Sequence, residues 1–406
     1  MVRPALSRLS GVLHRPLPPP PEALRRGPFR AVFTSRLRSP RLTSQLGLAL
    51  GVAFGICFVT GLLSHLIQHP PSWFWWPARP VGLYRVTQGL HVATGLASIT
   101  LLSAKLWSVF PKLFVWPPAR DIAQALERTS IVVLASAALF EVVSGVLNIA
   151  GWYSVMPFAF IAGHYWTAWI AIGALLAHIG IKLPIVRAAL SRRAQTPADE
   201  VRGAPSGLSR RGLITAVAAT VGVVTLSTVG QTVPALRGIS VLAPRRPDIG
   251  PQGLPVNTSA AAAGVQQVLR DPGYRLTVTG PTGRAVLSLN DLAAMPQRTV
   301  NLPITCVEGW SADGMWTGVP IHDLLALIGV TGSDATVLVE SLQRDSPYRT
   351  SILDAQHAAD PLTILALRLN GEVLHADHGY PCRLIAPNRP GVMQTKWVNV
   401  VRVLGT

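Results

Sequence analysis

The chain is poor in cysteine, in charge and above all in acidic residues. Its 406 residues include three cysteines, Cys57, Cys306 and Cys382, which are too few and too scattered for a disulfide framework. Only 14% of the residues are charged, whereas 49% are hydrophobic, a composition that is apolar for a soluble protein and indicates a membrane protein. No glycine-rich loop of the nucleotide-binding kind occurs, which argues against a nucleotide site of that type.

The chain is strongly basic, and the positions of the basic residues indicate which kind of partner this charge serves. The chain has 36 Lys and Arg against 19 Asp and Glu, a net charge of +17, and arginine is concentrated in residues 3–41, where Glu22 is the single acid. Such segments bind nucleic acid or flank the cytoplasmic ends of membrane helices. Residues 1–44 are also rich in proline and carry no apolar period, so they predict a disordered basic cytosolic tail. Because the charge lies on a tail and on loops, and not on a folded face, we expect no nucleic-acid partner.

Four runs have the length and apolarity to cross a bilayer, which takes roughly 20 residues. They cover residues 45–67, 84–109, 130–149 and 158–181 and predict an all-α transmembrane bundle over residues 45–182. The connection between the second and third runs and the segment after the fourth are basic, with Lys105, Lys112, Arg120, Arg128, Lys182, Arg187, Arg192 and Arg193. The first outer connection, "HPPSWFWWPARPVGLY", is instead an aromatic belt. The positive-inside and aromatic-belt rules therefore agree in placing the N-terminus in the cytoplasm.

A fifth apolar stretch, residues 212–233, is poorer in leucine and phenylalanine and begins within the sequence "SRRGLI". Two adjacent arginines ahead of a mildly apolar segment resemble a twin-arginine export signal, with Leu213 at the apolar position after the pair. The alternative is two stop-transfer arginines at an ordinary helix start. In either case we expect a cytosolic linker over residues 183–211, a fifth transmembrane helix over 212–236 and an extracytoplasmic domain over 237–406.

Four histidines lie in or at the edge of the predicted spans, where ionisable residues are rare and usually functional. They are His65, His91, His164 and His178. His91 lies seven residues beyond Tyr84 and His164 seven residues beyond Pro157, so at 1.5 Å of rise per residue both are about 10 Å below the outer surface. Two imidazoles at one depth on different helices of a bundle are what a b-type haem with two histidine ligands requires. We therefore expect His91 and His164 to bind the haem iron.

The other two histidines keep more than one interpretation. His178 is fourteen residues past His164, a spacing that two-haem cytochromes b use, but the spans offer no further histidine near the cytoplasmic side. One haem is therefore expected, with His65 and His178 as alternative iron ligands, as hydrogen-bonding residues between helices or as quinone contacts. Glu141, in the third span, either relays a proton from a quinol or pairs with a nearby polar group.

Residues 237–406 predict a soluble α+β domain, because short runs rich in β-branched residues alternate with Gly, Pro and Asn boundaries. The strand candidates are residues 274–280, 298–307, 335–342, 362–371, 381–388 and 396–405. The stretch "IHDLLALIG" predicts a short helix that ends at Gly329.

Three motifs in this domain occur in the order of a known family. They are "CVEGWS" with the following "W.GVP..DLL", then "LNGEVLHADHGYPCRLIAPN", then "GVMQTKWV". Together they resemble the sulfite oxidase family of molybdenum enzymes over most of residues 250–405. The resemblance implies a molybdopterin cofactor whose metal is bound by Cys306, the catalytic residue. A soft thiolate suits such a metal, which is also held by the two dithiolene sulfurs of the pterin.

The resemblance also implies which residues hold the cofactor. Ser341 matches a hydroxyl position that contacts it, and Asn257 is a weaker candidate from the start of the domain. The residues expected to grip the pterin and its phosphate are His378, Arg383, Gln394, Thr395 and Lys396. These types suit the task, since Arg offers a fork of donors for phosphate oxygens and Lys a point charge. Cys382 is expected to be a small buried residue.

Two departures from the family pattern bear on the substrate. The sequence ends soon after the "KWV" strand, whereas sulfite oxidases continue into an immunoglobulin-like domain, and "GPQGLPV" lacks the arginine expected before "LPV". We therefore do not expect a sulfite-binding pocket. The shorter form resembles the periplasmic molybdoenzyme that reduces protein methionine sulfoxide with a separate haem-bearing membrane partner. The complete layout resembles the five-span membrane molybdoenzymes of actinobacteria, in which a four-helix b-type cytochrome is fused in front.

These features predict a membrane-anchored molybdopterin-dependent oxidoreductase. Electrons would pass between an extracytoplasmic substrate and the quinone pool through molybdenum and haem b. An S-oxide or N-oxide is the favoured substrate. Both directions of electron flow fit the sequence, and reduction of the substrate is favoured. The expected partners are quinone or quinol, a small or protein-bound oxidised substrate, membrane lipid and the twin-arginine export machinery. The alternative is a non-catalytic membrane cytochrome b whose outer domain binds a partner.

Overall fold

A computed structural model describes residues 37–113, 119–191, 209–246, 249–332 and 334–405. The chain forms two compact units, Met1–Val59 with Ala93–Thr225, and Thr60–Val92 with Leu226–Thr406. Most of the predicted cytosolic tail and the middle of the predicted linker lie outside the described residues. The division falls within the first two long helices, so the end of one and the beginning of the other belong to the same unit as the C-terminal domain.

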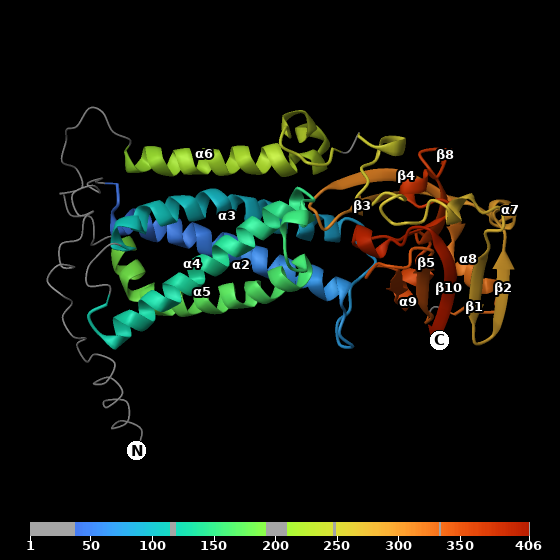
Figure 1. Cartoon of the computed structure of the whole chain (residues 1–406), viewed down its shortest axis with the longest axis horizontal. Helices are drawn as coiled ribbons and strands as arrows, with labels where there is room; N and C mark the ends of the chain where they lie inside the picture. Colours follow the sequence, from blue (N-terminus) through green and yellow to red (C-terminus); the bar gives the residue numbers. More distant parts are fainter. Residues whose placement is uncertain (1–36, 114–118, 192–208, 247–248, 333, 406) are drawn as a thin grey trace, which may run out of the picture. The chain divides into compact units, whose positions relative to one another are not determined.

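Five helices are long and apolar enough, by length and composition, to span a membrane. They are α2 (Pro40–Gln68), α3 (Leu83–Leu113), α4 (Ile122–Ile149), α5 (Phe160–Leu190) and α6 (Arg210–Val229), coloured from blue to yellow-green in Figure 1. All five predicted spans are therefore confirmed as helices. At 1.5 Å of rise per residue, α2 to α5 are each longer than the roughly 30 Å of a bilayer core.

The helix boundaries differ from the predicted spans. Lys105 and Lys112, expected in a connecting loop, lie in the last turns of α3, and Arg128 lies in α4. Hydropathy marks only the apolar part of a helix, whereas its backbone hydrogen bonds continue through polar residues at either end. The helix α6 ends earlier than predicted, at Val229, and short 3₁₀ turns over Gly230–Thr232 and Pro234–Ile239 follow it.

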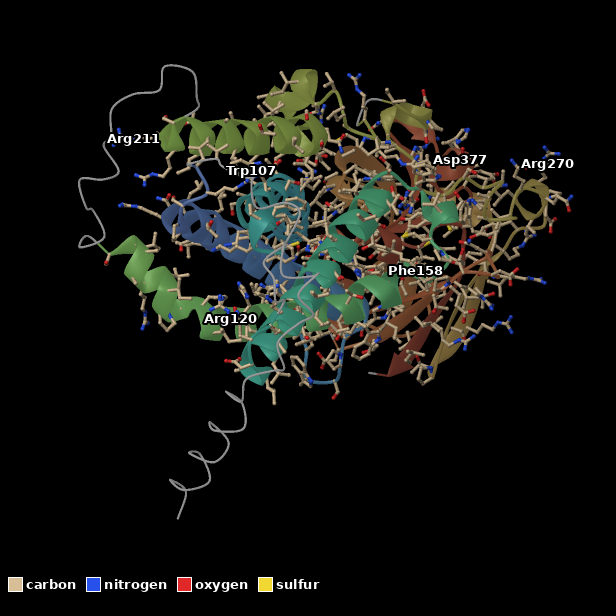
Figure 2. All side chains as sticks on the ribbon, turned by 60° about the vertical axis from the view of Figure 1, so that its left-hand side comes forward. Trp107, Arg120, Phe158, Arg211, Arg270 and Asp377 are labelled. Carbon is tan, nitrogen blue, oxygen red and sulfur yellow. The ribbon has the colours of Figure 1, made fainter. Side chains whose placement is uncertain are left out.

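The helix α4 begins with a regular cap and packs along α5. The Asp121 carboxylate accepts a hydrogen bond from a backbone N–H of the first turn, at 2.7 Å, and so satisfies one of the free donors of the helix end. Figure 2 labels the preceding residue, Arg120, and also Arg211 in the first turn of α6. Where α4 and α5 pack together, an ion pair joins Glu127 to Lys182.

The C-terminal domain is built on two five-stranded sheets. The first has the strand order β2-β1-β10-β5-β6, in which β1 is parallel to β10 and all other neighbours are antiparallel. The second has the order β3-β4-β7-β8, with β9 also paired to β7, and is antiparallel throughout. The strands are β1 (Leu276–Gly280), β2 (Gly283–Leu287), β3 (Arg298–Thr305), β4 (Ser311–Pro320), β5 (Thr336–Ser341), β6 (Thr350–Leu353), β7 (Ile364–Leu369), β8 (Glu372–Val373), β9 (Arg383–Ile385) and β10 (Val398–Gly405). Three short helices, α7 (Leu289–Ala294), α8 (Ile321–Ala326) and α9 (Ala355–Ala359), complete an α+β fold and confirm that prediction.

All six strands expected from the sequence are present, but the longest strand of the domain, β4, was not predicted as one. Its sequence, "SADGMWTGVP", contains Asp and two glycines, which are rare in strands. The structure explains Gly318, because a Cβ there would overlap the Leu365 carbonyl oxygen of β7. The register between β4 and β7 also shifts between Thr317 and Gly318, as at a β-bulge. A residue that strand propensity disfavours is therefore required by the close approach of a neighbouring strand.

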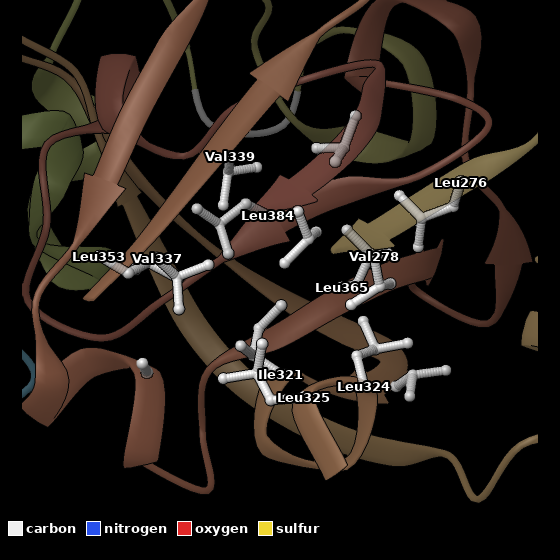
Figure 3. Packing of buried hydrophobic residues seen from close by; sticks show 14 of the residues in the cluster. Leu276, Val278, Ile321, Leu324, Leu325, Val337, Val339, Leu353, Leu365 and Leu384 are labelled. Carbon is white, nitrogen blue, oxygen red and sulfur yellow. The ribbon is translucent and has the colours of Figure 1, made fainter. Parts of the chain in front are cut away.

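The main core of the domain includes residues of the first sheet, the second sheet and α8. It contains Leu276 and Val278 of β1 and Val337 and Val339 of β5, with Leu365 of β7, Leu384 of β9 and the leucines of α8 in the same cluster (Figure 3). The alternation of buried and exposed residues along β5 places every second side chain in this core. A second cluster surrounds Trp316 of β4 and includes Cys306. The cysteine thus lies in the packed interior of the domain.

Replacement of Leu324 by alanine is expected to destabilise the domain strongly. Leu324 is fully buried, and removal of such a side chain lowers the free energy of unfolding by about 2–5 kcal/mol. Leu327, at the end of the same helix, is 49% exposed, and its replacement by alanine should change stability by about 0.5 kcal/mol or less. Urea unfolding in detergent, followed by near-ultraviolet circular dichroism, measures both variants. Equal midpoints for the two would contradict the described core.

Candidate active site

Cys306 lies directly after β3, at the tip of the hairpin that β3 forms with β4. The Cys306 N–H donates to the Trp310 carbonyl at 2.9 Å, and the Gly309 N–H donates to the Cys306 carbonyl at 3.0 Å. Gly309 has a φ of 93°, a left-handed conformation that favours glycine. These contacts close residues 306–309 into a turn, named the cysteine turn below. Cys306 itself is only 2% exposed.

The surroundings of the Cys306 thiol disfavour a free thiolate. Burial raises the pKa of this thiol well above its ordinary value, and the Glu308 carboxylate raises it further. Arg245 and Lys396 act in the opposite direction and lower the pKa. A buried thiol of this kind is inert by itself, but a bound metal cation deprotonates a coordinating thiol. The site therefore suits a cysteine that works as a metal ligand rather than as a free nucleophile.

Lys396 is a buried cation whose partners, among the described residues, are neutral. Its ammonium donates to the Thr258 carbonyl at 2.8 Å and to Asn257 Oδ1 at 3.2 Å, and lies 5.3 Å from the ring centroid of Trp397. Burial lowers the pKa of Lys396 to about 7, and the charge of Arg383 contributes to the decrease. A ligand with negative charge would stabilise the protonated ammonium.

Arg383 is buried in a similar way at the start of β9. Its Nε donates to the Gln394 carbonyl at 3.2 Å and its Nη1 to the His378 carbonyl at 3.3 Å. The guanidinium carbon lies 5.5 Å from the ring centroid of Trp316, within the range of a cation–π contact. Burial lowers the pKa of Arg383 to about 9. Two cations thus lie in the interior with backbone carbonyls and aromatic rings as their described partners.

His378 differs from these two because the structure makes it neutral. Its Nε2 lies 2.7 Å from the Pro251 carbonyl, which can only accept, so Nε2 carries the proton. Burial lowers the pKa of His378 to about 4, and the Arg383 charge adds to this effect. At neutral pH the imidazole is therefore uncharged, and Nδ1 is the nitrogen that can accept a hydrogen bond. His378 can bind a polar group, but it does not add a third positive charge.

Two more buried polar atoms in this region have no hydrogen-bond partner within the part of the chain that the structure describes. They are Oε1 of Gln394 and Nη1 of Arg389. Burial of cations without acidic partners is unfavourable, and so is burial of unpaired polar atoms. An anionic ligand with several donors and acceptors would relieve both, and a pterin that carries a phosphate is such a ligand. The donor set therefore fits the cofactor that the resemblance to sulfite oxidases implies.

Three other predicted cofactor residues are engaged mainly with the protein itself. Ser341, at the end of β5, donates to the Lys396 carbonyl at 2.7 Å and accepts from a backbone N–H at 3.1 Å. The Thr395 hydroxyl lies 2.7 Å from that of Ser351. Asn257 accepts from Lys396 and from the Thr258 N–H. These contacts orient the segment that carries Lys396, and their roles as cofactor contacts stay predictions.

The structure adds residues that the sequence did not single out. Arg389 is buried, with a pKa lowered to about 10 by burial, and donates to the Ile352 carbonyl at 2.6 Å. Burial raises the pKa of Tyr348, and the charge of the Cys306 thiolate raises it further, which brings this phenol into the surroundings of the cysteine. A buried arginine within "APNRP" was visible in the sequence only as one of many arginines. Its burial depends on the folded loop between β9 and β10.

Among the histidines of the spans, His164 is held on one side of its ring. Its Nδ1 lies 2.9 Å from the Ser144 hydroxyl and 3.1 Å from Glu141 Oε2, both on α4. Its ring also stacks on that of Phe160, with 5.0 Å between centroids. Glu141 thus pairs with a polar neighbour, which was one of the two roles expected for it.

The other three histidines have different surroundings. A Cβ at Gly61 of α2 would lie 2.7 Å from Cε1 of His91, so the imidazole rests against the α2 backbone. The rings of His65 and His69 lie 4.9 Å apart. Nδ1 of His178 has no hydrogen-bond partner within the described ranges. No group of three or more His, Cys, Asp or Glu suited to a metal ion occurs in the described residues. A haem bound by two histidines is a different kind of site and stays a prediction.

Comparison with known proteins supports the interpretation of the C-terminal domain. Residues 262–406 match the model of the oxidoreductase molybdopterin binding domain family. A protein of Azospira oryzae named as subunit YedZ1 of a protein-methionine-sulfoxide reductase is 34% identical over 131 residues, 32% of this chain and 48% of that protein. The mitochondrial sulfite oxidase of Mus musculus is 34% identical over 158 residues, 32% of this chain and 29% of that protein.

A solved structure is also similar, that of the sulfane dehydrogenase SoxCD from Paracoccus pantotrophus. It is 26% identical, with 32% of this chain and 38% of that chain covered and a TM-score of 0.30. The chain spans less than half the length of each of these relatives. Residues 262–406 thus form a sulfite oxidase-like, molybdopterin-binding oxidoreductase domain.

Proposed function

We propose that this protein is a membrane-anchored molybdenum oxidoreductase that exchanges electrons between an extracytoplasmic substrate and the quinone pool through a b-type haem. The observation that carries the proposal is the position of Cys306, a buried thiol in a closed turn next to buried cations whose hydrogen-bond partners are neutral. The five helices of membrane-spanning length give the chain its anchor. Cofactor and domain type follow from residues 262–406.

The residues around Cys306 have distinct tasks in this proposal. When bound, the molybdenum cofactor supplies two-electron oxygen-atom chemistry. Cys306 holds the metal as a thiolate, while Arg383 and Lys396 bind the negative charge of the pterin phosphate. Trp310 and Trp316, both buried, exclude water from the inner side of the site. His378 orients a polar group of the pterin through Nδ1, because Nε2 is engaged with a carbonyl.

The haem is assigned to His91 and His164. At His164, Nδ1 contacts Ser144 and Glu141, so Nε2 would be the nitrogen that binds iron, and a carboxylate that accepts from Nδ1–H would increase the basicity of such a ligand. His65 and His178 are the alternative ligands or quinone contacts. Quinone, membrane lipid and the substrate are the proposed partners.

The substrate class is proposed to be an S-oxide or N-oxide. The relative from Azospira oryzae carries the name of a protein-methionine-sulfoxide reductase subunit, which supports an S-oxide. The N-terminus is proposed to be cytoplasmic and the C-terminal domain extracytoplasmic. The arginine pair at Arg210 and Arg211 then serves twin-arginine export of a domain that folds around its cofactor in the cytoplasm.

Replacement of Cys306 by serine should remove the metal-dependent activity, because a hydroxyl is a much harder ligand than a thiolate. We expect wild-type protein to contain about one molybdenum per chain by elemental analysis. The Cys306→Ser variant should retain pterin but lose the Mo(V) electron paramagnetic resonance signal of the parent. Cys382→Ser is the matched control, since Cys382 is a buried cysteine that contacts Tyr274. Purified wild-type protein without molybdenum would favour the non-catalytic cytochrome instead.

Replacement of His164 by alanine should abolish the haem spectrum. One of two axial ligands is lost, so the reduced-minus-oxidised bands of a b-type haem should disappear or change to those of a five-coordinate haem. His178→Ala serves as the control and should retain the spectrum if one haem is bound by His91 and His164. An unchanged spectrum in His164→Ala, together with a lost one in His178→Ala, would move the ligand assignment to His178.

The direction of electron flow can be determined from the haem absorbance. Protein that has been reduced with dithionite and freed of excess reductant should be re-oxidised by methionine sulfoxide or trimethylamine N-oxide, because a reductase passes its electrons to such compounds. Oxidised protein should not be reduced by methionine or trimethylamine under the same conditions. Reduction of the haem by an added substrate would instead identify a dehydrogenase.

A further inference from the structure

One face of α3 lies against the cysteine turn. Gln88 Nε2 donates to the Val307 carbonyl at 3.1 Å, and Val92, four residues on, packs against Gly309. Residues four apart on a helix share a face, so Tyr84, Gln88 and Val92 form one stripe. The residues Thr60–Val92 belong to the same compact unit as the C-terminal domain. A helix of the predicted membrane bundle therefore contributes side chains to the surroundings of the metal-binding cysteine.

Gly309 has two independent reasons to be glycine. Its φ of 93° lies in the left-handed region. In addition, a Cβ at this position would lie 2.8 Å from Cγ2 of Val92. The cysteine turn is thus shaped to fit against α3 and does not face solvent on this side.

A chain of buried hydrogen bonds fixes the Gln88 amide. The Gln68 amide lies 3.3 Å from the Ser64 hydroxyl, which lies 3.0 Å from the Tyr84 hydroxyl, which in turn lies 3.5 Å from Gln88 Oε1. Ser64, Tyr84 and Gln88 are all buried. If each group donates to the next, Oε1 of Gln88 accepts from Tyr84 and Nε2 is left to donate to the Val307 carbonyl. A fully paired buried network of this kind makes one side-chain geometry strongly preferred.

The beginning of α3 is anchored to the domain at a second point. Asn388, in the loop after β9, accepts from the Tyr84 N–H at 2.6 Å and donates through Nδ2 to the Pro77 carbonyl at 2.6 Å. The Trp76 indole donates to the Asn388 carbonyl at 2.8 Å. Arg79, in the segment that precedes α3, forms an ion pair with Asp360 of the domain. The stripe on α3 is therefore held in register with the cysteine turn.

We propose that Gln88 is a positioning residue for Cys306: its amide holds the Val307 carbonyl and thereby the orientation of the thiolate as a metal ligand. This inference rests on the proposed function for the metal at Cys306. His91, the proposed haem ligand, lies three residues after Gln88 on the same helix. The helix α3 thus carries both Gln88, which contacts the cysteine turn, and His91.

The test compares Gln88→Met with Gln297→Met in the full-length protein. Both changes remove an amide that donates to backbone carbonyls and keep the side-chain length, but Gln297 donates to Leu292 and Met295 and belongs to neither the cysteine turn nor the hydrogen-bond chain described above. Two readouts are used, the g-values of the Mo(V) electron paramagnetic resonance signal and amide hydrogen exchange of a peptide that covers residues 304–311. Gln88→Met should shift the g-values, because the direction of the sulfur changes, and should exchange faster in this peptide. Gln297→Met should resemble the parent in both.

A second variant keeps the test decisive if Gln88→Met folds poorly. Tyr84→Phe removes the hydroxyl that orients the amide and leaves Gln88 in place, and should shift both readouts in the same direction by a smaller amount. Parent-like g-values and exchange in both Gln88→Met and Tyr84→Phe would overturn the proposal. Equal shifts in Gln297→Met would overturn it too, since they would indicate a general loosening of the domain. Absence of molybdenum from the parent would contradict the proposed function, while hydrogen exchange would still decide whether Gln88 holds the turn.

Discussion

Burial of positive charge with neutral hydrogen-bond partners is the constraint on which the C-terminal domain depends. Lys396 and Arg383 lie in the interior with carbonyls and indole rings as their described neighbours, and burial lowers the pKa of both. Charged groups in such positions destabilise a fold unless a counter-charge compensates them. In the proposed function, a phosphate on a bound pterin provides that charge, and binding of the cofactor would then stabilise the domain. The same proposal accounts for the buried Cys306 thiol, because a metal cation makes the thiolate favourable.

The cysteine turn connects this interior to the helices. On the domain side, hydrogen bonds to Trp310 close the turn, and the carboxylate of Glu308 accepts from the Trp310 indole at 3.0 Å. On the helix side, Gln88 and Val92 of α3 contact the turn directly. Soluble and membrane parts of the chain thus share one set of contacts around the sulfur. A mutation in the first turns of α3 can therefore affect the metal site without any contact with the cofactor itself.

Most of the fold could be predicted from the sequence, and each feature that was not predicted has a specific physical cause. The membrane spans were predicted because a run of roughly 20 apolar residues is long enough to cross a bilayer and is rare in soluble proteins. The ends of the helices were not predicted, because helical hydrogen bonding continues past the apolar residues. Strand β4 was missed because its glycines contradict strand propensity, and only the neighbouring strand β7 accounts for Gly318. In the candidate site, Cys306, Arg383 and Lys396 were predicted from ordered motifs, and the structure shows Cys306 and Arg383 to be buried and Lys396 to be largely buried. Arg389 and Gln88 were not predicted, because burial and contacts between distant segments single them out.

The sequence by itself determined the type of chemistry: apolar runs specify helices that suit a bilayer, and spaced motifs specify a molybdopterin-binding domain with a cysteine at its centre. The tertiary structure decided which protonation states and contacts are possible. It makes His378 neutral, because a carbonyl takes its one proton donor and burial disfavours the charge. It also brings Gln88 to a residue 219 positions away in the chain. Distances of this kind are set by the packing of the whole chain, and no local pattern of residues encodes them.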